Sequence, residues 1–470
     1  MSKHRVCRWR ETGWLMSIAA VLLLGVSATA HAQSVLCVSA GKVGSGKAKK
    51  FGCTGPLFIT IGDAVSVAAA GDEIFVFNGI YPEMVTIGAN LNGLALIGQN
   101  PRKTIIDASG LPNGILSMAS GVIIDGFTVE NANNEGIYVH GAAPQCANQQ
   151  CTSAGPPITG VTILSNNVIG NDRALNNSTC AGVPDFEQED CGEGLHIDGV
   201  AFSTVAANQI SGNAGGILIT DETNANHGNL IADNTVTDNI PDCGITLPSH
   251  PPAGSAANIG IPSFGVFNNT VQGNLSRGNG AAGVGIFTPT PGTASHNNLI
   301  VGNTLLDNAN PGVIFHSHTP LQNLNSNSVV GNFISGNGAE PNPGPTENDG
   351  PTEPTGIEIY ADVAAAPLLN TKINGNTIQN ETNDIWVGAP GWNNCPEGAT
   401  TPCYNVAANS NNLKGRGAVG VDGTGDATAT LVDATGNWWG CPKGPGGAPK
   451  CSTAQGSVST TPFRTSKVNP

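Results

Sequence analysis

The chain has 470 residues, with 19 Lys and Arg against 34 Asp and Glu, and a formal net charge of −15. A surface this acidic repels phosphate backbones, which argues against nucleic acid as a partner. It also disfavours a polyanionic polysaccharide, unless metal ions or a local basic patch intervene. Apolar residues make up 39% of the chain and recur regularly, which argues against a disordered chain.

The first 32 residues predict a signal peptide. Four basic residues precede an apolar run from Leu15 to Ala30, and Ala30-His31-Ala32 supplies a small-x-small cleavage pattern. The run is shorter than the ~20 residues that a membrane span needs, although a membrane anchor is the alternative. We therefore expect a secreted protein, extracellular or periplasmic, that makes no membrane contact once the signal is removed.

Cysteine spacing predicts local disulfides. In an exported chain, cysteines close in sequence are expected to pair. Zinc binding is the less favoured alternative, because no C-x-x-C pair occurs. Outside the signal, only Cys243 has no sequence-close partner. The five expected couples are Cys37 with Cys53, Cys146 with Cys151, Cys180 with Cys191, Cys395 with Cys403, and Cys441 with Cys451.

An internal repeat dominates the rest of the chain. The pattern Asn-x-[Val/Ile/Leu]-x-x-Asn recurs at unequal intervals, as expected of a coil of twenty-odd residues with loop insertions. Asn and Gly at fixed offsets suit tight corners, and stacked Asn side chains can hydrogen-bond from coil to coil. The copies are Asn166–Asn171, Asn208–Asn213, Asn234–Asn239, Asn269–Asn274, Asn303–Asn308 and Asn332–Asn337, with a looser copy at Asn376.

A short strand follows the Gly after most copies. Its first and third residues are apolar in every copy, whereas the second and fourth are mixed and often polar. This period of two predicts a strand with one face inward, and such strands bury that face only by stacking. The inward pairs are Ile137 and Val139, Leu195 and Ile197, Ile217 and Ile219, Ile245 and Leu247, Val284 and Ile286, Val313 and Phe315, and Ile357 and Ile359.

These features predict an all-β, single-domain, right-handed parallel β-helix. We expect a signal peptide over 1–32, a disulfide-stapled N-terminal segment over 33–56, the β-helix over 57–440, and a C-terminal cap and tail over 441–470. Leucine-rich and helical repeats are excluded by the composition and by the period. We expect a monomer.

The sequence resembles the pectin-lyase-like parallel β-helix superfamily, and similar bacterial secreted proteins, over about residues 57–465. Residues 61–66 resemble the short helix that caps the first coil, and Gly71–Tyr81 resembles the first strand with its Gly-x-Tyr end. Gly436-Asn-Trp-Trp-Gly440 resembles the closing segment of such proteins, where the two Trp cap the core; sugar stacking is the alternative. The superfamily includes lyases, esterases, epimerases and hydrolases of polysaccharides, together with members of no known chemistry.

Two functions therefore remain open, a polysaccharide-active enzyme and a non-catalytic surface-interaction protein. The polygalacturonase Asp signature and the epimerase Asp-Pro-His-Asp motif are missing. Gly136–His140 resembles the frame of the epimerase motif, with His140 four residues after the Gly. However, Tyr138 replaces the first Asp of that motif, and Gly141 replaces the last.

The outward strand positions supply the candidate catalytic residues, Tyr138, His140, His196 and Asp198. Strands of successive coils lie about 4.8 Å apart, so His140 and Asp198 should be vertical neighbours. A carboxylate beside a His fixes its tautomer and a Tyr can act as an acid, which suits proton abstraction or hydrolysis on a sugar chain. Arg173 could meet an anionic substrate. The alternative is a set of ordinary solvated side chains.

A divalent metal ion is the only cofactor that the sequence suggests. His316 and His318 lie two residues apart on one strand face, a geometry that can hold a metal if a third ligand comes from elsewhere. A plain surface pair is the alternative.

Overall fold

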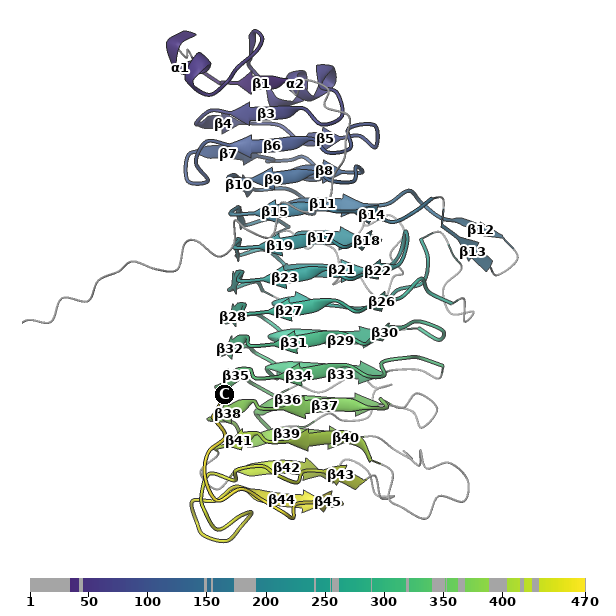
Figure 1. Cartoon of the computed structure of the whole chain (residues 1–470), viewed down its shortest axis with the longest axis vertical. Coiled ribbons are helices and arrows are strands. Elements are labelled where there is room, and N and C mark those ends of the chain that lie inside the picture. The colour runs from purple at the N-terminus through teal and green to yellow at the C-terminus, as the bar shows by residue number, and fades with distance from the viewer. Residues whose placement is uncertain are drawn as a thin grey trace, which may run out of the picture. The chain divides into compact units, whose positions relative to one another are not determined.

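The computed structural model describes residues 34–41, 45–147, 150–153, 155–172, 192–240, 242–253, 255, 262–288, 290–317, 321–339, 351, 353–361, 368–388, 404–414, 418–424 and 431–469. The predicted signal peptide lies outside these residues. Three long sheets of parallel strands run through the described part, and successive coils stack one on the next (Figure 1). This pairing is that of the predicted right-handed parallel β-helix.

Sheet A has fifteen strands in the described part of the chain. Apart from the pairing of β1 with both β2 and β3, its order follows the chain. Its strands are β2 (Leu57–Phe58), β1 (Val35–Val38), β3 (Glu73–Val76), β6 (Ala95–Gly98), β9 (Ile123–Asp125), β15 (Thr162–Leu164), β19 (Thr204–Ala206), β23 (Leu230–Ala232), β27 (Thr270–Gln272), β31 (Leu299–Val301), β34 (Ser328–Val330), β37 (Thr371–Asn374), β40 (Tyr404–Asn409), β43 (Leu431–Asp433) and β45 (Val458–Ser459).

Sheet B follows sheet A after a two-residue corner in most coils, whereas five residues, 99–103, lie between Gly98 and Thr104. Its strands are β4 (Gly79–Tyr81), β7 (Thr104–Asp107), β10 (Thr128–Glu130), β16 (Asn167–Ile169), β20 (Gln209–Ser211), β24 (Thr235–Thr237), β28 (Leu275–Arg277), β32 (Thr304–Leu306), β35 (Phe333–Ser335), β38 (Thr377–Gln379) and β41 (Asn412–Leu413).

Sheet C contains the strands that follow the repeated Gly. They are β5 (Val85–Ile87), β8 (Ile115–Ser117), β11 (Ile137–His140), β17 (Glu193–Asp198), β21 (Gly215–Thr220), β25 (Ile245–Thr246), β29 (Val284–Thr288), β33 (Val313–Ser317), β36 (Thr355–Ala361), β39 (Asn383–Gly388), β42 (Val419–Gly423) and β44 (Thr453–Gly456). All fourteen predicted inward side chains have 0% exposure, which confirms the alternation.

Two smaller sheets lie beside the coils. One has five strands, β14 (Ile158–Thr159), β18 (Val200–Ala201), β22 (Asn226–His227), β26 (Val266–Phe267) and β30 (Ser295–His296). The other is the hairpin of β12 (Gln145–Ala147) and β13 (Gln150–Thr152), which contains the Cys146–Cys151 disulfide.

Asparagine ladders hold the corners together. At the corner between sheets A and B, a residue with positive φ precedes each Asn, and every Asn Nδ2 donates to the next Oδ1 at 2.9–3.2 Å. This ladder comprises Asn166, Asn208, Asn234, Asn274, Asn303, Asn332, Asn376, Asn411 and Asn437. A second ladder at the corner between sheets B and C comprises Asn171, Asn213, Asn239, Asn279, Asn308 and Asn337. The predicted coil-to-coil bonding of Asn is confirmed.

The ladders correct the register of one repeat copy. Asn269 belongs to a third ladder, at the corner before sheet A, where its Oδ1 accepts from Asn229 Nδ2 at 3.0 Å. The structural counterpart of the other copies is therefore Asn274–Asn279. The sequence pattern missed it because Ser276, a fully buried residue, occupies the usual apolar position.

Both ends of the core are closed. At the start, α2 (Ile61–Val67) is capped by Thr60, whose side chain accepts from Asp63 N, and it buries Ile61 and Ala64. The short α1 (Ser45–Lys50) precedes it. At the other end Trp439 is fully buried in the core, whereas Trp438 is half-buried, with Lys467 Nζ 5.4 Å from its ring centre. The predicted capping helix is present, and Trp439 has the predicted core position.

The terminal segments contribute strands to the long sheets. Segment 33–56 provides β1, paired with β3, and segment 441–470 provides β44 and β45. Each also contains one of the predicted disulfides, Cys37–Cys53 and Cys441–Cys451.

The described residues include three of the five predicted cysteine couples. Three of the five expected couples are disulfides, and Cys243 is unpaired and buried, as expected. The other two couples lie outside the described residues, because Cys180 and Cys191 fall between 172 and 192, and Cys395 and Cys403 fall between 388 and 404. The pairing of Cys180 with Cys191 and the pairing of Cys395 with Cys403 therefore stay predictions.

A carboxyl group ends the second ladder. Glu381 Oε1 accepts from both the backbone N and the Nδ2 of Asn337, each at 3.1 Å, in the place of a further Asn. Burial raises the pKa of Glu381 to about 7, against the bonds from Asn337. A carboxyl whose pKa is raised on folding stabilises the folded state while it is protonated. The contribution of Glu381 to the free energy of unfolding is therefore complete below a pH of about 4.5 and is lost as the pH rises through about 7.

We therefore expect Glu381→Gln to be more stable than the wild type, but only at high pH. Its free energy of unfolding should exceed that of the wild type by about 2–3 kcal/mol near pH 8 and match it near pH 4. Urea unfolding followed by circular dichroism at both pH values measures this. A difference that stays the same at both would contradict it.

Candidate functional site

The four predicted catalytic residues lie on two adjacent strands of sheet C. Tyr138 and His140 belong to β11, and His196 and Asp198 to β17. The register pairs Tyr138 with His196 and His140 with Asp198, so each pair is separated by one strand spacing of about 4.8 Å. The stacking of the coils therefore makes these four residues neighbours, as predicted.

The outer face of sheet C is not a plain solvated surface at this place. His196 is 5% exposed and Asp198 1%, whereas Tyr138 and His140 are half-buried. The segment after β21 packs here, because Thr223 N donates to Asp198 Oδ1 at 3.0 Å and Gly141 N donates to Thr223 Oγ1 at 3.1 Å. The interpretation of His196 and Asp198 as solvated side chains is therefore wrong.

The Tyr138 ring lies between two imidazoles. Its centre is 4.7 Å from those of both His140 and His196, and both pairs are stacked at 23°. Burial raises the pKa of Tyr138 well above its usual value, and the nearby charges of Asp198, Glu222 and Glu135 act in the same direction. The phenol therefore keeps its proton and remains a donor.

His140 is arranged as a proton acceptor. Its Nδ1 lies 2.8 Å from the carbonyl oxygen of Gly141, which can only accept, so Nδ1 carries the hydrogen and Nε2 keeps a lone pair. Burial lowers the pKa of His140, and the like charge of His196 adds to that, although the bond to Gly141 opposes it. The neutral imidazole is the form that can take up a proton.

His196 is held on both sides of its ring. Its Nδ1 lies 3.3 Å from Glu135 Oε1, and its Nε2 lies 2.8 Å from Thr220 Oγ1, whose hydroxyl donates to Glu222 Oε2 at 3.4 Å. Burial lowers the pKa of His196, but the bond to Glu135 and the nearby carboxylate charges outweigh it, so the pKa is raised. Both ring nitrogens are therefore engaged, and the ring is stacked on Tyr138.

Asp198 lies beside this chain. Burial and the charge of Glu222 raise the pKa of Asp198 to about 7, against the opposing effects of His196 and Thr223. Burial alone would raise the pKa of Glu222, but His250, whose Nδ1 is 3.6 Å from Glu222 Oε1, lowers it. The two neighbouring carboxyls therefore differ in their affinity for a proton.

Sequence reasoning missed two buried carboxylates beside His196. Glu135, 6% exposed, and Glu193, 2% exposed, each precede the Gly that opens a sheet C strand. The pair Glu-Gly in two successive coils, at Glu135-Gly136 and Glu193-Gly194, is the signal that would have found them. One ligand atom from each and one from His196 all lie within 4.8 Å of one another.

The other predicted site residues lie elsewhere or outside the described residues. Arg173 and His318 fall outside them. His316 is buried in β33, with its Nε2 3.0 Å from Oε1 of the fully buried Glu358 and its ring edge toward Tyr360. His316 is therefore not a plain surface residue. Metal binding by His316 and His318 stays a prediction.

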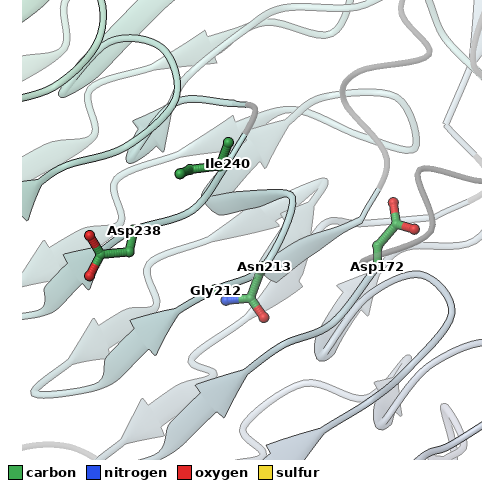
Figure 2. Close-up of a pocket in the computed structure, with 5 residues that line it drawn as sticks. All are labelled: Asp172, Gly212, Asn213, Asp238 and Ile240. Atoms are coloured by element: carbon green, nitrogen blue, oxygen red, sulfur yellow. The ribbon is translucent and has the colours of Figure 1, made fainter.

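A polar pocket of about 250 Å³ lies at the corner before sheet C, lined by Asp172, Gly212, Asn213, Asp238 and Ile240. Figure 2 shows Asn213 between the carboxylates of Asp172 and Asp238. A Cβ placed on Gly192 would clash with the Asp172 carboxylate, so this pocket borders the segment that leads into Glu193 and β17.

No family model and no curated protein matches the sequence. Solved structures with similar coils include the A-module of the mannuronan C-5 epimerase AlgE4 from Azotobacter vinelandii, at 15% identity and a TM-score of 0.42, over 86% of this chain and 92% of that one. The Dettilon tailspike protein (gp208) has 15% identity and a TM-score of 0.46, over 84% and 63%.

A third similar structure is the catalytic unit of the GH87 α-1,3-glucanase from Streptomyces thermodiastaticus strain HF3-3. It has 15% identity and a TM-score of 0.40, over 95% of this chain and 72% of that one. Because the identities are 15% and the TM-scores are below 0.5, a function has to be inferred from the side chains of this chain. Its own strand pairing makes it a right-handed parallel β-helix, with a cluster of buried and half-buried His, Tyr and carboxyl groups on the outer face of sheet C.

Proposed function

We propose that the protein is a polysaccharide-processing enzyme that moves protons on a sugar chain, of lyase, epimerase or hydrolase type. His140 is its base, Tyr138 its acid, and His196 and Asp198 are positioning residues. The observation that carries the proposal is the stacking of a neutral His, whose Nε2 keeps its lone pair, on a protonated Tyr, with ring centres 4.7 Å apart. A base beside an acid supports removal of a proton next to a sugar carbonyl group.

The expected substrate follows from the charge of the chain. A formal net charge of −15 repels free uronate chains, whereas an esterified uronic polysaccharide has the same acidic C–H without the charge. We expect the protein to act outside the cytoplasm as a monomer. The disulfides Cys37–Cys53, Cys146–Cys151 and Cys441–Cys451 support an oxidising compartment. Within the described residues, no helix has both the length and the apolar character of a membrane span.

A substrate panel tests the proposal. The purified chain would be incubated with esterified polyuronates, free polyuronates and neutral glucans, and unsaturated ends, reducing ends and epimer content would be measured. We expect unsaturated or epimerised product from an esterified polyuronate. Binding without any product across the panel would overturn the proposal in favour of a non-catalytic binding protein.

A further inference from the structure

We propose that Glu135, Glu193 and His196 form a binding site for one first-row divalent metal ion such as Zn²⁺. This inference does not depend on the proposed activity, because metal uptake is measured without a substrate. It concerns a different place from the predicted His316 and His318 pair, which belongs to β33 and the residues after it.

The three side chains converge from two successive coils. Glu135 comes from the turn before β11, whereas Glu193 and His196 come from β17 in the next coil. Their ligand atoms lie within 4.8 Å of one another. Bonds of about 2.0–2.2 Å from Zn²⁺ to oxygen and nitrogen place two ligands at most ~4.4 Å apart, so shifts of a few tenths of an ångström are sufficient.

One buried oxygen atom of these side chains lacks a partner within the described part of the chain. Glu135 is 6% exposed; its Oε1 faces His196, whereas its Oε2 is shielded from solvent and has no hydrogen-bond partner among the described residues. A buried carboxylate oxygen without a partner is costly, and a bound cation would compensate for it. The orphaned atom belongs to one of the three converging side chains.

A hydrogen-bond chain supports the His196 ring on the side away from Glu135. A metal-binding His usually donates its other ring N–H to a neighbouring acceptor, which fixes the tautomer and aims the free nitrogen at the ion. Here Nε2 lies 2.8 Å from Thr220 Oγ1, which in turn donates to Glu222, so Nε2 can keep its hydrogen while Nδ1 faces Glu135. On metal binding, Nδ1 would give up the hydrogen that it shares with Glu135 and bind the ion through its lone pair. This is the arrangement that orients an imidazole ligand.

Local backbone features leave room for the site. Glu193 is in register with Gly215 of the next coil, and a Cβ there would lie 3.1 Å from both Cγ and Oε1 of Glu193. Two carboxylates and one imidazole suit Zn²⁺ or Mn²⁺ better than Ca²⁺, which prefers oxygen ligands alone.

The test uses the whole secreted chain, purified without an affinity tag and stripped with a chelator. Calorimetric titration with ZnCl₂ should give one site per chain, and metal analysis after dialysis should give one Zn²⁺. Glu135→Gln should abolish uptake. Thr220→Val, which only removes the support of His196, should weaken it roughly 10–100-fold. Circular dichroism would verify that each variant is folded.

Two controls distinguish this site from the alternatives. Glu358→Gln removes a buried carboxylate that also pairs with a His on sheet C, and uptake should not change. If His316→Gln lost Zn²⁺ uptake and Glu135→Gln retained it, the metal would bind at the predicted His316 site, and the proposal would be overturned. In the wild type, X-ray absorption at the zinc edge should show one imidazole among oxygen ligands. Failure of the wild type to bind Zn²⁺ would also overturn it.

Discussion

Replacing His140 with alanine should lower the turnover of the processed polysaccharide by about 10²–10⁴-fold, the usual cost of losing a general base. Tyr138→Phe should have an effect of the same order, because it removes only the donating hydroxyl and keeps the ring between the two imidazoles. Both variants should fold, since Tyr138 and His140 are half-buried on the outer face of sheet C.

The matched control is His227→Ala. His227 is also half-buried and stacked on an aromatic ring, that of Phe267, but it lies on the five-stranded sheet. Initial rates with the substrate found in the panel, at several concentrations, would separate kcat from KM. Wild-type turnover in His140→Ala, or an equal loss in His227→Ala, would remove His140 from the active centre.

Asp198 requires a gentler substitution than alanine. Its outward strand position predicted a side chain outside the core, but it is 1% exposed and accepts from Thr223 N at 3.0 Å. Alanine would leave that buried amide without a partner. Asp198→Asn keeps the acceptor and is the variant that reports on proton transfer rather than on folding.

The largest expected effect on stability is at the centre of the first Asn ladder. Asn274 is 1% exposed; its Nδ2 donates to Asn303 Oδ1 and to Ile231 O, and its Oδ1 accepts from both nitrogens of Asn234. Alanine would remove these bonds and orphan buried groups on both neighbouring coils. Each buried group left unpaired costs about 1–3 kcal/mol, so we expect Asn274→Ala to lose roughly 3–5 kcal/mol.

Urea unfolding followed by circular dichroism would measure this loss. The control is Asn133→Ala, because Asn133 is exposed and does not belong to a ladder, and it should change the free energy of unfolding by less than about 0.5 kcal/mol. Similar changes in the two variants would mean that the ladder contributes little beyond the shape of its corners.

The amino-acid sequence alone determined the architecture and the inner face of the protein. Apolar residues at alternate positions after each Gly can be buried only if strands stack, and Asn repeated at the corners can bond from coil to coil. The same periodicity sets the register, so Tyr138, His140, His196 and Asp198 were predictable as neighbours. These are consequences of a repeat, which a single chain displays.

Only the tertiary structure decided what surrounds those side chains. A repeat does not reveal that the segment after β21 buries the outer face of sheet C, or that Glu135 meets Glu193 and His196 from another coil. Nor does it reveal that Glu358 lies beside His316. Burial and charge pairing depend on insertions that break the period, and burial and nearby charge are what shift the pKa of a side chain. The fold was therefore readable from the pattern, whereas the chemistry of the site required the packing of its irregular parts.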